Sequence, residues 1–115
     1  MHTLDILVVY HEENRYLIPF SDILYLEADG KTTWVYYLKQ SAQPQICEVL
    51  SYKNLGYYVQ LLQTSPLVQT HRSYMVNMYQ VEEIVKNQVV FKHPVETKIY
   101  LTGKFRKNLN NRLPQ

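Results

Sequence analysis

Few side chains in this sequence are placed to do chemistry. The run His11-Glu12-Glu13 sets a histidine beside two carboxylates, and it offers either metal ligands or an acid–base pair. The run falls in a polar stretch between two apolar segments, where a solvated turn is the simpler interpretation. The four histidines and the single cysteine, Cys47, show none of the paired spacings that metal sites use. We therefore expect no metal, no cofactor and no enzymatic activity.

Other binding chemistries also lack their sequence frames. Three glycines in the whole chain provide neither a phosphate-binding loop nor a dinucleotide fingerprint. One cysteine cannot form an internal disulfide, and no apolar run approaches the roughly 18 residues that a membrane span needs. We see no charged-then-apolar leader. We expect the chain to work in the reducing cytoplasm.

The charge of the chain is unevenly distributed. The formal net charge is only +2, but residues 1–85 carry five Lys or Arg against nine Asp or Glu, a net charge of −4. Residues 86–115 carry seven Lys or Arg against Glu96 alone, a net charge of +6. A basic segment of this kind favours a polyanionic partner, although a solvated charged face would produce the same pattern.

The length and the pattern of the chain predict one β-rich domain. A chain of 115 residues with 46% hydrophobic residues suits a single domain, residues 1–115, which could be a fragment of a larger protein. Apolar segments alternate with turn signals about every ten residues, as in all-β domains. Asp29-Gly30 is the strongest hairpin signal. We expect strands at residues 4–10, 15–20, 23–28, 32–38, 46–50, 67–72, 81–85, 88–91 and 97–101.

Two helices and one loop complete the predicted elements. Leu55, Tyr58 and Leu62 recur at helical spacing after Ser51, which can serve as the N-cap, and this helix should end near Pro66. Residues 73–77 show no clean period and are expected to form a loop. Residues 104–113 are expected to form a basic C-terminal helix with Phe105, Leu109 and Leu113 on one side.

The most informative segment is Thr70-His71-Arg72-Ser73-Tyr74-Met75-Val76-Asn77, which joins a basic residue to hydrogen-bonding groups beside a predicted strand end. It resembles the central signature of the LytTR family of DNA-binding domains, in which His-Arg-Ser is followed after one or two residues by Val-Asn. Residues 23–30 look like the family's upstream strand and turn, and residues 81–84 with 89–91 look like its downstream hairpin. The resemblance covers nearly the whole chain, with the pieces in the right order.

The resemblance implies a fold and a function. The expected fold is mainly β, an elongated arrangement of about ten short strands in three small antiparallel sheets, with one central and one C-terminal helix. The expected function is sequence-specific binding of double-stranded DNA in bacterial transcription regulation, with loops entering successive major grooves. The expected partners are paired direct-repeat promoter sites and an upstream receiver domain of a two-component response regulator, with the domain alone a monomer or a weak dimer.

Three contact regions carry over from the family to this sequence. They are the hairpin turn with the start of the next strand, the loop of the central signature, and the segment before the last helix, which here comprise Gly30, Lys31, Thr32 and Thr33, then His71 and Arg72, then Thr102 and Lys104. The family usually carries Ser-Arg or Ser-X-Arg in the third region, so Thr102-Gly103-Lys104 is a departure. Lysine is a point charge where arginine would bind guanine through two parallel bonds.

Individual roles follow from side-chain chemistry. Arg72 is the best candidate for a direct base contact, with a surface ion pair as the alternative. His71 could donate to a phosphate or be purely structural. Ser73 and Asn77 are expected to support the loop that aims Arg72. Phosphate contacts are expected from Tyr52, Lys53, Arg106 and Lys107, with simple solvation as the alternative for Lys53.

Two other classes of function remain open at the level of sequence. A single-stranded nucleic-acid or RNA binder would stack bases on exposed tyrosines such as Tyr25, Tyr36 and Tyr37, and burial of those rings would argue against it. A protein-interaction β module would instead use exposed strand edges and would be indifferent to nucleic acid.

Overall fold

The computed structural model describes residues 5–111 of the chain. Its helices and strands follow in the order β1 (Ile6–His11), β2 (Asn14–Pro19), β3 (Ile23–Asp29), β4 (Thr32–Lys39), β5 (Gln45–Ser51), α1 (Leu55–Leu61), β6 (Leu67–His71), β7 (Tyr74–Asn77), β8 (Val81–Val85), β9 (Gln88–Phe91), β10 (Lys98–Tyr100) and α2 (Arg106–Asn110). Short 3-10 turns occupy Phe20–Asp22 (η1), Met78–Gln80 (η2) and Gly103–Phe105 (η3). Neither helix of this described part has the length and apolar character to cross a membrane.

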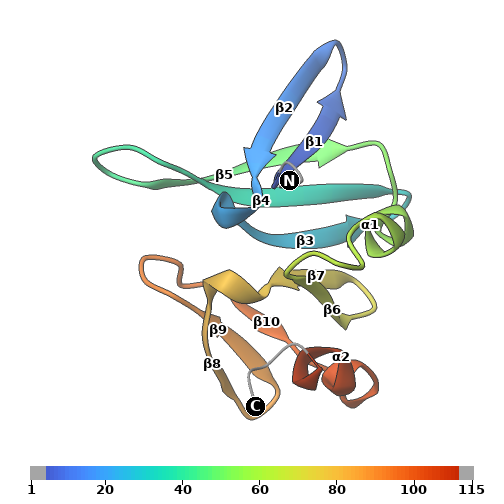
Figure 1. Ribbon diagram of the computed structural model, residues 1–115, viewed down its shortest axis with the longest axis vertical. Coiled ribbons are helices and arrows are strands. Elements are labelled where there is room, and N and C mark those ends of the chain that lie inside the picture. The colour runs from blue at the N-terminus through green and yellow to red at the C-terminus, as the bar shows by residue number, and fades with distance from the viewer. Residues whose placement is uncertain (1–4, 112–115) are drawn as a thin grey trace.

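The strands form three antiparallel sheets, as predicted. A five-stranded sheet in the order β5-β4-β3-β7-β6 lies between the β1–β2 hairpin on one side and a three-stranded sheet, β10-β9-β8, on the other (Figure 1). The molecule measures 40 × 34 × 34 Å along its principal axes.

The central strand β3 holds the layers together. Ile23, Leu24, Tyr25 and Leu26 are all buried in succession, which requires apolar packing on both faces of the strand. Ile23 and Leu26 belong to the core beneath the β1–β2 hairpin, and Leu24 and Tyr25 belong to the core above the three-stranded sheet. A register shift between Ile23 and Tyr25 in the pairing with β4 accompanies this departure from strict alternation.

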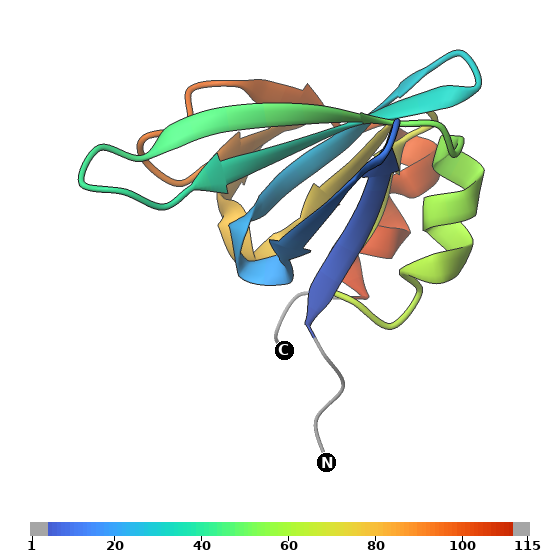
Figure 2. The same ribbon diagram turned by 90° about the horizontal axis from the view of Figure 1, so that it is seen from above.

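Each face of the five-stranded sheet is covered by different elements. The first core includes Val9 of the hairpin and Leu55, Tyr58 and Leu62 from α1 and its C-terminal end. The second core includes Val89 and Ile99 of the three-stranded sheet and Leu109 of α2. Both helices lie toward the end of the sheet that carries the β3–β4 turn, whereas the β4–β5 turn extends from the opposite end (Figure 2).

The expected loop at residues 73–77 is wrong, because residues 74–77 form strand β7. This strand pairs with β3 on one side and with β6 on the other, so it lies inside the sheet. Met75, Val76 and Asn77 are all buried. A strand buried on both faces has no alternation of polar and apolar residues, and for that reason the sequence showed no period.

The helix boundaries also differ from the predictions. Asn54, not Ser51, caps α1, and its side-chain oxygen accepts a hydrogen bond from the Tyr57 amide at 2.8 Å. Ser51 is buried at the end of β5, where its hydroxyl bonds the Tyr58 hydroxyl. The helix α2 spans Arg106–Asn110 and places Leu109 in the core, while the predicted contributions of Leu4 and Leu113 lie outside the described residues.

Several tyrosines are structural. Tyr25 stacks on Tyr36 with ring centroids 4.4 Å apart and also packs against Phe91. The hydroxyls of Tyr36 and Tyr74 donate to the two carboxylate oxygens of Glu27 at 3.0 and 2.9 Å. Burial, together with the bond to Glu27 and its charge, raises the pKa of Tyr74 to about 12 and raises the pKa of Tyr36 as well.

These raised values predict a loss of stability in alkali. Tyrosines of the unfolded chain ionise near pH 10, whereas Tyr74 in the fold keeps its proton to about pH 12. The free energy of unfolding should therefore be unaffected by this group below about pH 10 and should fall between about pH 10 and 12. Urea denaturation across this range measures the slope, and Tyr74→Phe should make it shallower. The exposed Tyr79→Phe is the control, and equal slopes for the two variants would contradict the prediction.

Candidate nucleic-acid interface

The antiparallel register brings three connections to one end of the five-stranded sheet. Asp29 pairs with Thr32 across the β3–β4 turn, and Thr33 pairs with Ser51, where β5 leads into the loop before α1. Glu27 pairs with Tyr74, which follows the β6–β7 turn. Most of the residues that the sequence singled out lie in these three connections, although Gly30 and Arg72 are 42 positions apart along the chain.

The segment before α2 joins this end through the backbone. The amide of Thr102 donates to the carbonyl of Thr70 at 3.0 Å, next to the β6–β7 turn. Asn108 of α2 donates through its side chain to the carbonyl of Gln69 at 3.1 Å. All three contact regions expected from the family resemblance therefore share one end of the molecule, which we call the loop end: residues 29–33, 51–54, 70–73 and 102–104.

The β3–β4 turn is a tight two-residue turn with Gly30 and Lys31 at its centre, one residue beyond the predicted pair. Gly30 has φ +61°, a left-handed conformation that glycine adopts without strain. Thr32 donates through its hydroxyl to the Asp29 carbonyl at 2.7 Å, and the Trp34 indole donates to the Asp29 carboxylate at 3.1 Å. These bonds fix the turn and leave Lys31 exposed.

Thr33 has a different position from its neighbours in the turn. It is completely buried, and its hydroxyl donates to the carbonyl of Lys53 at 2.9 Å. The side chain therefore connects the β3–β4 turn with the loop before α1 and has no surface to offer a ligand. Lys53 itself is exposed, with its ammonium 5.1 Å from the ring centre of Tyr57.

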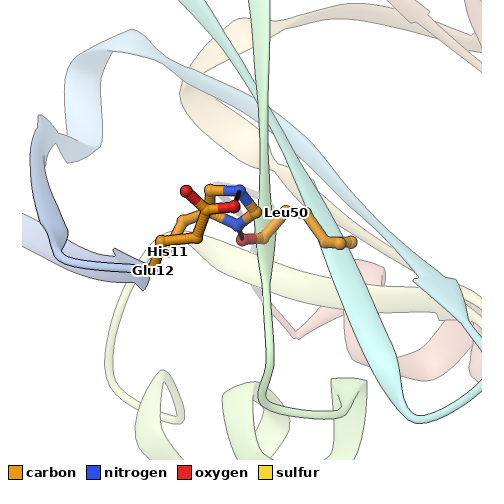
Figure 3. A network of polar contacts seen from close by, with 3 residues as sticks. All are labelled: His11, Glu12 and Leu50. Atoms are coloured by element: carbon orange, nitrogen blue, oxygen red, sulfur yellow. Dashed lines mark hydrogen bonds and ion pairs between the residues drawn. The ribbon is translucent and has the colours of Figure 1, made fainter.

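His11 is a structural link between the hairpin and the loop end. Its Nδ1 donates to the Leu50 carbonyl at 3.0 Å, and its Nε2 lies 3.8 Å from the Glu12 carboxylate (Figure 3). Its ring stacks on the exposed ring of Tyr52 at 5.3 Å. Among residues 5–111, no three His, Cys, Asp or Glu side chains form a group that could hold a metal ion.

The β6–β7 turn carries His71 and Arg72. Nδ1 of His71 accepts a hydrogen bond from the Ser73 amide at 3.1 Å, so the neutral ring carries its proton on Nε2. The Ser73 carbonyl accepts from the Ala28 amide at 2.8 Å, which ties the turn to β3. Arg72 is exposed and forms no hydrogen bond or ion pair with any residue that the structure describes.

A β-bulge precedes the turn. The pairing of β6 with β7 shifts register between Gln69 and His71, and Thr70 lies at this shift. Thr70 is fully buried, and its hydroxyl has no hydrogen-bond partner among the described residues. A bulge redirects the side chains that follow it, so this irregularity sets the direction of His71 and Arg72.

Asn77 supports another part of the fold. It is fully buried, and its side-chain nitrogen donates to the carbonyls of Phe20 and Ile23 at 2.6 and 2.8 Å. Its oxygen accepts from the Tyr79 amide at 3.0 Å. These bonds fix the entry to β3 and the start of η2, at the opposite end of β7 from Arg72.

The basic C-terminal residues have different surroundings. Lys104 and Lys107 are exposed, and the Lys104 ammonium lies 5.5 Å from the ring centre of Phe105. Arg106 is engaged within the fold, because its guanidinium donates to the Lys86 carbonyl at 3.3 Å and to the Asn87 side chain at 2.9 Å. Arg112, which contributes to the basic segment, lies outside the described residues.

Comparison with known proteins agrees with this architecture. The model of the LytTr DNA-binding domain family matches residues 13–114. The chain belongs to the LytTR family. No curated protein matched it. Among solved structures, the LytTr DNA-binding domain of a methyl-accepting/DNA response regulator from Bacillus cereus superposes with a TM-score of 0.62 at 18% identity, over 94% of this chain and 95% of that one.

Membership confirms the family resemblance and the mainly β fold, and it makes this LytTR chain a DNA-binding domain of transcription regulation. LytTR is a family of DNA-binding domains and not of enzymes. Sequence reasoning missed three features: the burial of Thr33 and the bulge at Thr70 in the loop end, and the engagement of Arg106 in α2. All three features depend on contacts between residues that are distant in the sequence. Only the bulge left a local signal, because an interruption of the two-residue alternation expected of strands over residues 67–77 could have indicated it.

The contacts of Asn77 in the LytTR fold predict a large loss of stability on truncation. Asn77→Ala leaves one buried carbonyl, one part-buried carbonyl and one amide without their partner, so the free energy of unfolding should fall by about 3 kcal/mol. Denaturant titration measures the change. Asn110→Ala, in the exposed part of α2, is the control and should cost nothing. A loss of under about 1 kcal/mol for Asn77→Ala would show that water replaces these bonds.

Proposed function

We propose that this LytTR domain binds double-stranded DNA sequence-specifically, with the loop end placed against successive major grooves. The observation that carries the proposal is the gathering of exposed cations from four separate segments at this end. Lys31, Lys53, Arg72 and Lys104 come from the β3–β4 turn, the loop before α1, the β6–β7 turn and η3. None of them forms an ion pair with a residue among 5–111, so their charge is available to phosphates.

Arg72 is the proposed base-reading residue. Its guanidinium offers two parallel donors that match the O6 and N7 acceptors of guanine, and nothing described in the fold competes for them. The turn that carries it is fixed by backbone bonds to β3 and to His71 Nδ1, so little ordering is required on binding. A contact of this kind contributes about 1–3 kcal/mol of discrimination between bases.

The other loop-end residues, together with Lys107 of α2, are proposed to position the domain on the DNA backbone. Phosphate contacts are assigned to Lys31, Lys53, Lys104, Lys107, the Nε2–H of His71, the hydroxyls of Tyr52 and Thr102, and the backbone at Gly30 and Thr32. Thr33 and Ser73 are proposed to hold the loops in place. Lysine at position 104 provides charge without the two-pronged geometry of arginine, so the segment before α2 contributes less to base reading.

A single-strand-binding platform is less well supported. Tyr25 is buried in the second core, Tyr36 stacks on it, and Tyr37 packs against the first core. The three rings therefore contribute to packing within the fold. Stacking of unpaired bases needs ring faces free of such contacts.

The wider setting is proposed from the family. We expect residues 1–115 to act as one DNA-binding unit, since the five-stranded sheet contributes to both cores. In a response regulator such a unit would be joined to a receiver domain and would bind paired direct repeats, as a monomer or weak dimer when alone. Its DNA ligand places it in the cytoplasm.

Selection from a random pool of double-stranded DNA tests the proposal. One enriched sequence should emerge, bound in preference to single strands, and Arg72→Ala should weaken its binding by about 1–3 kcal/mol. Arg72→Lys should keep most of the salt dependence but lose most of the discrimination, because it retains the charge without the fork.

Lys39→Ala is the control for this experiment, because Lys39 is exposed at the opposite end of the five-stranded sheet. It should leave affinity unchanged. Equal effects of Arg72→Ala and Lys39→Ala would show that Arg72 reads no base. An absence of binding even at low salt would refute DNA binding and leave the protein-interaction alternative.

A further inference from the structure

The turn between β8 and β9 holds a lysine in an unfavourable conformation. Val85 pairs with Gln88, so Lys86 and Asn87 form a two-residue turn, and Lys86 has φ +57°. This left-handed region suits glycine or asparagine, and a lysine there carries a steric cost that its side chain does not repay within the described fold. Lys86 is exposed and forms no ion pair with a described residue.

Hydrogen bonds from Leu101 and Arg106, which flank residues 102–104 of the loop end, fix the same turn. The Leu101 amide donates to the Asn87 carbonyl at 2.7 Å. Arg106 donates to the Lys86 carbonyl at 3.3 Å and to the Asn87 side chain at 2.9 Å. The bonds from Leu101 and Arg106 therefore hold Lys86 in a left-handed conformation that glycine or asparagine would adopt at lower steric cost.

This turn is linked to the loop end through backbone hydrogen bonds. Leu101, which bonds Asn87, immediately precedes Thr102, whose amide bonds the carbonyl of Thr70. The β8–β9 turn is therefore connected through residues 101–102 to the turn that carries Arg72. Its nearest acidic neighbours along the strand are Glu82 and Glu83, and Glu83 pairs with Val90, on the far side of Val85 from the turn.

We propose that Lys86 binds a phosphate of the DNA backbone, as a contact point on the three-stranded sheet, and that Arg106 is the positioning residue that presents it. The inference rests on the proposed DNA binding. It also changes the role of Arg106, which the sequence predicted to contact a phosphate itself. Because its guanidinium bonds Lys86 and Asn87, Arg106 instead holds the turn that presents Lys86 to the DNA. A phosphate contact adds affinity and salt dependence but does not read bases.

Lys86→Asn provides the decisive variant, because asparagine tolerates the left-handed conformation while removing the charge. Its thermal stability should equal or exceed that of the wild type. Its plot of log affinity against log salt concentration should be shallower by about 0.9, the value for one lost phosphate contact on duplex DNA. Affinity should fall by the same factor for the selected sequence and for random duplex DNA.

Lys92→Asn is the matched control, because Lys92 is exposed at the opposite end of β9 in the same sheet and its loss changes the net charge equally. It should leave the salt slope unchanged. Equal slopes for the two variants, or a wild-type slope for Lys86→Asn, would overturn the proposal while leaving DNA binding itself intact. An absence of wild-type binding would overturn both.

Arg106→Lys separates positioning from direct contact. It keeps the charge but replaces the planar guanidinium whose Nη2 donates both bonds to the turn, so the positioning role predicts a shallower salt slope, approaching that of Lys86→Asn. The double variant Lys86→Asn with Arg106→Lys should have the same salt slope as Lys86→Asn alone. A wild-type slope for Arg106→Lys, or a further fall of about 0.9 when Arg106→Gln is added to Lys86→Asn, would assign Arg106 a phosphate of its own.

Discussion

The pairing of β3 with β4 and β7 is the constraint on which the rest of the structure depends. Because β3 lies in the middle of the five-stranded sheet, its successive buried residues supply side chains to the cores on both faces. The same antiparallel register places the starts of β4 and β7 beside the end of β3, and the end of β5 beside the start of β4. A slip of one residue would exchange the two faces and separate the loops, so one pairing pattern determines both core and interface.

The loops at this end are fixed mainly by bonds that involve the backbone, which leaves their charged side chains free. Ser73 bonds Ala28, Thr102 bonds Thr70, and the Thr33 hydroxyl bonds the Lys53 carbonyl. Binding then requires ordering of the lysine and arginine side chains but little ordering of the loops themselves. The buried, unpaired hydroxyl of Thr70 and the left-handed Lys86 are local costs, and both lie in or beside the segments proposed to meet DNA.

The sequence predicted most of the fold because its strands are short, mostly amphipathic and separated by strong turn signals. It failed at β7, where burial on both faces removes the alternation, and at Ser51, whose hydroxyl bonds Tyr58 while Asn54 caps the helix. For the candidate site, the sequence predicted which loops carry basic and hydrogen-bonding residues. Which of those residues are exposed depends on register between distant strands, so the burial of Thr33 and the engagement of Arg106 with Lys86 could not be derived from local pattern.

The distribution of lysine and arginine at the loop end assigns affinity and base discrimination to different residues. Arginine is best suited to reading guanine. Arg72 is the one arginine of the loop end, and its guanidinium is exposed and unengaged among the described residues, while Lys31, Lys53 and Lys104 are the point charges of the same end. Lysines bind phosphates with little preference for sequence. Affinity would then be spread over several contacts and respond strongly to salt, whereas base discrimination would be concentrated in one turn. The hydrogen bonds and the bulge that fix that turn are therefore as important to specificity as Arg72 itself.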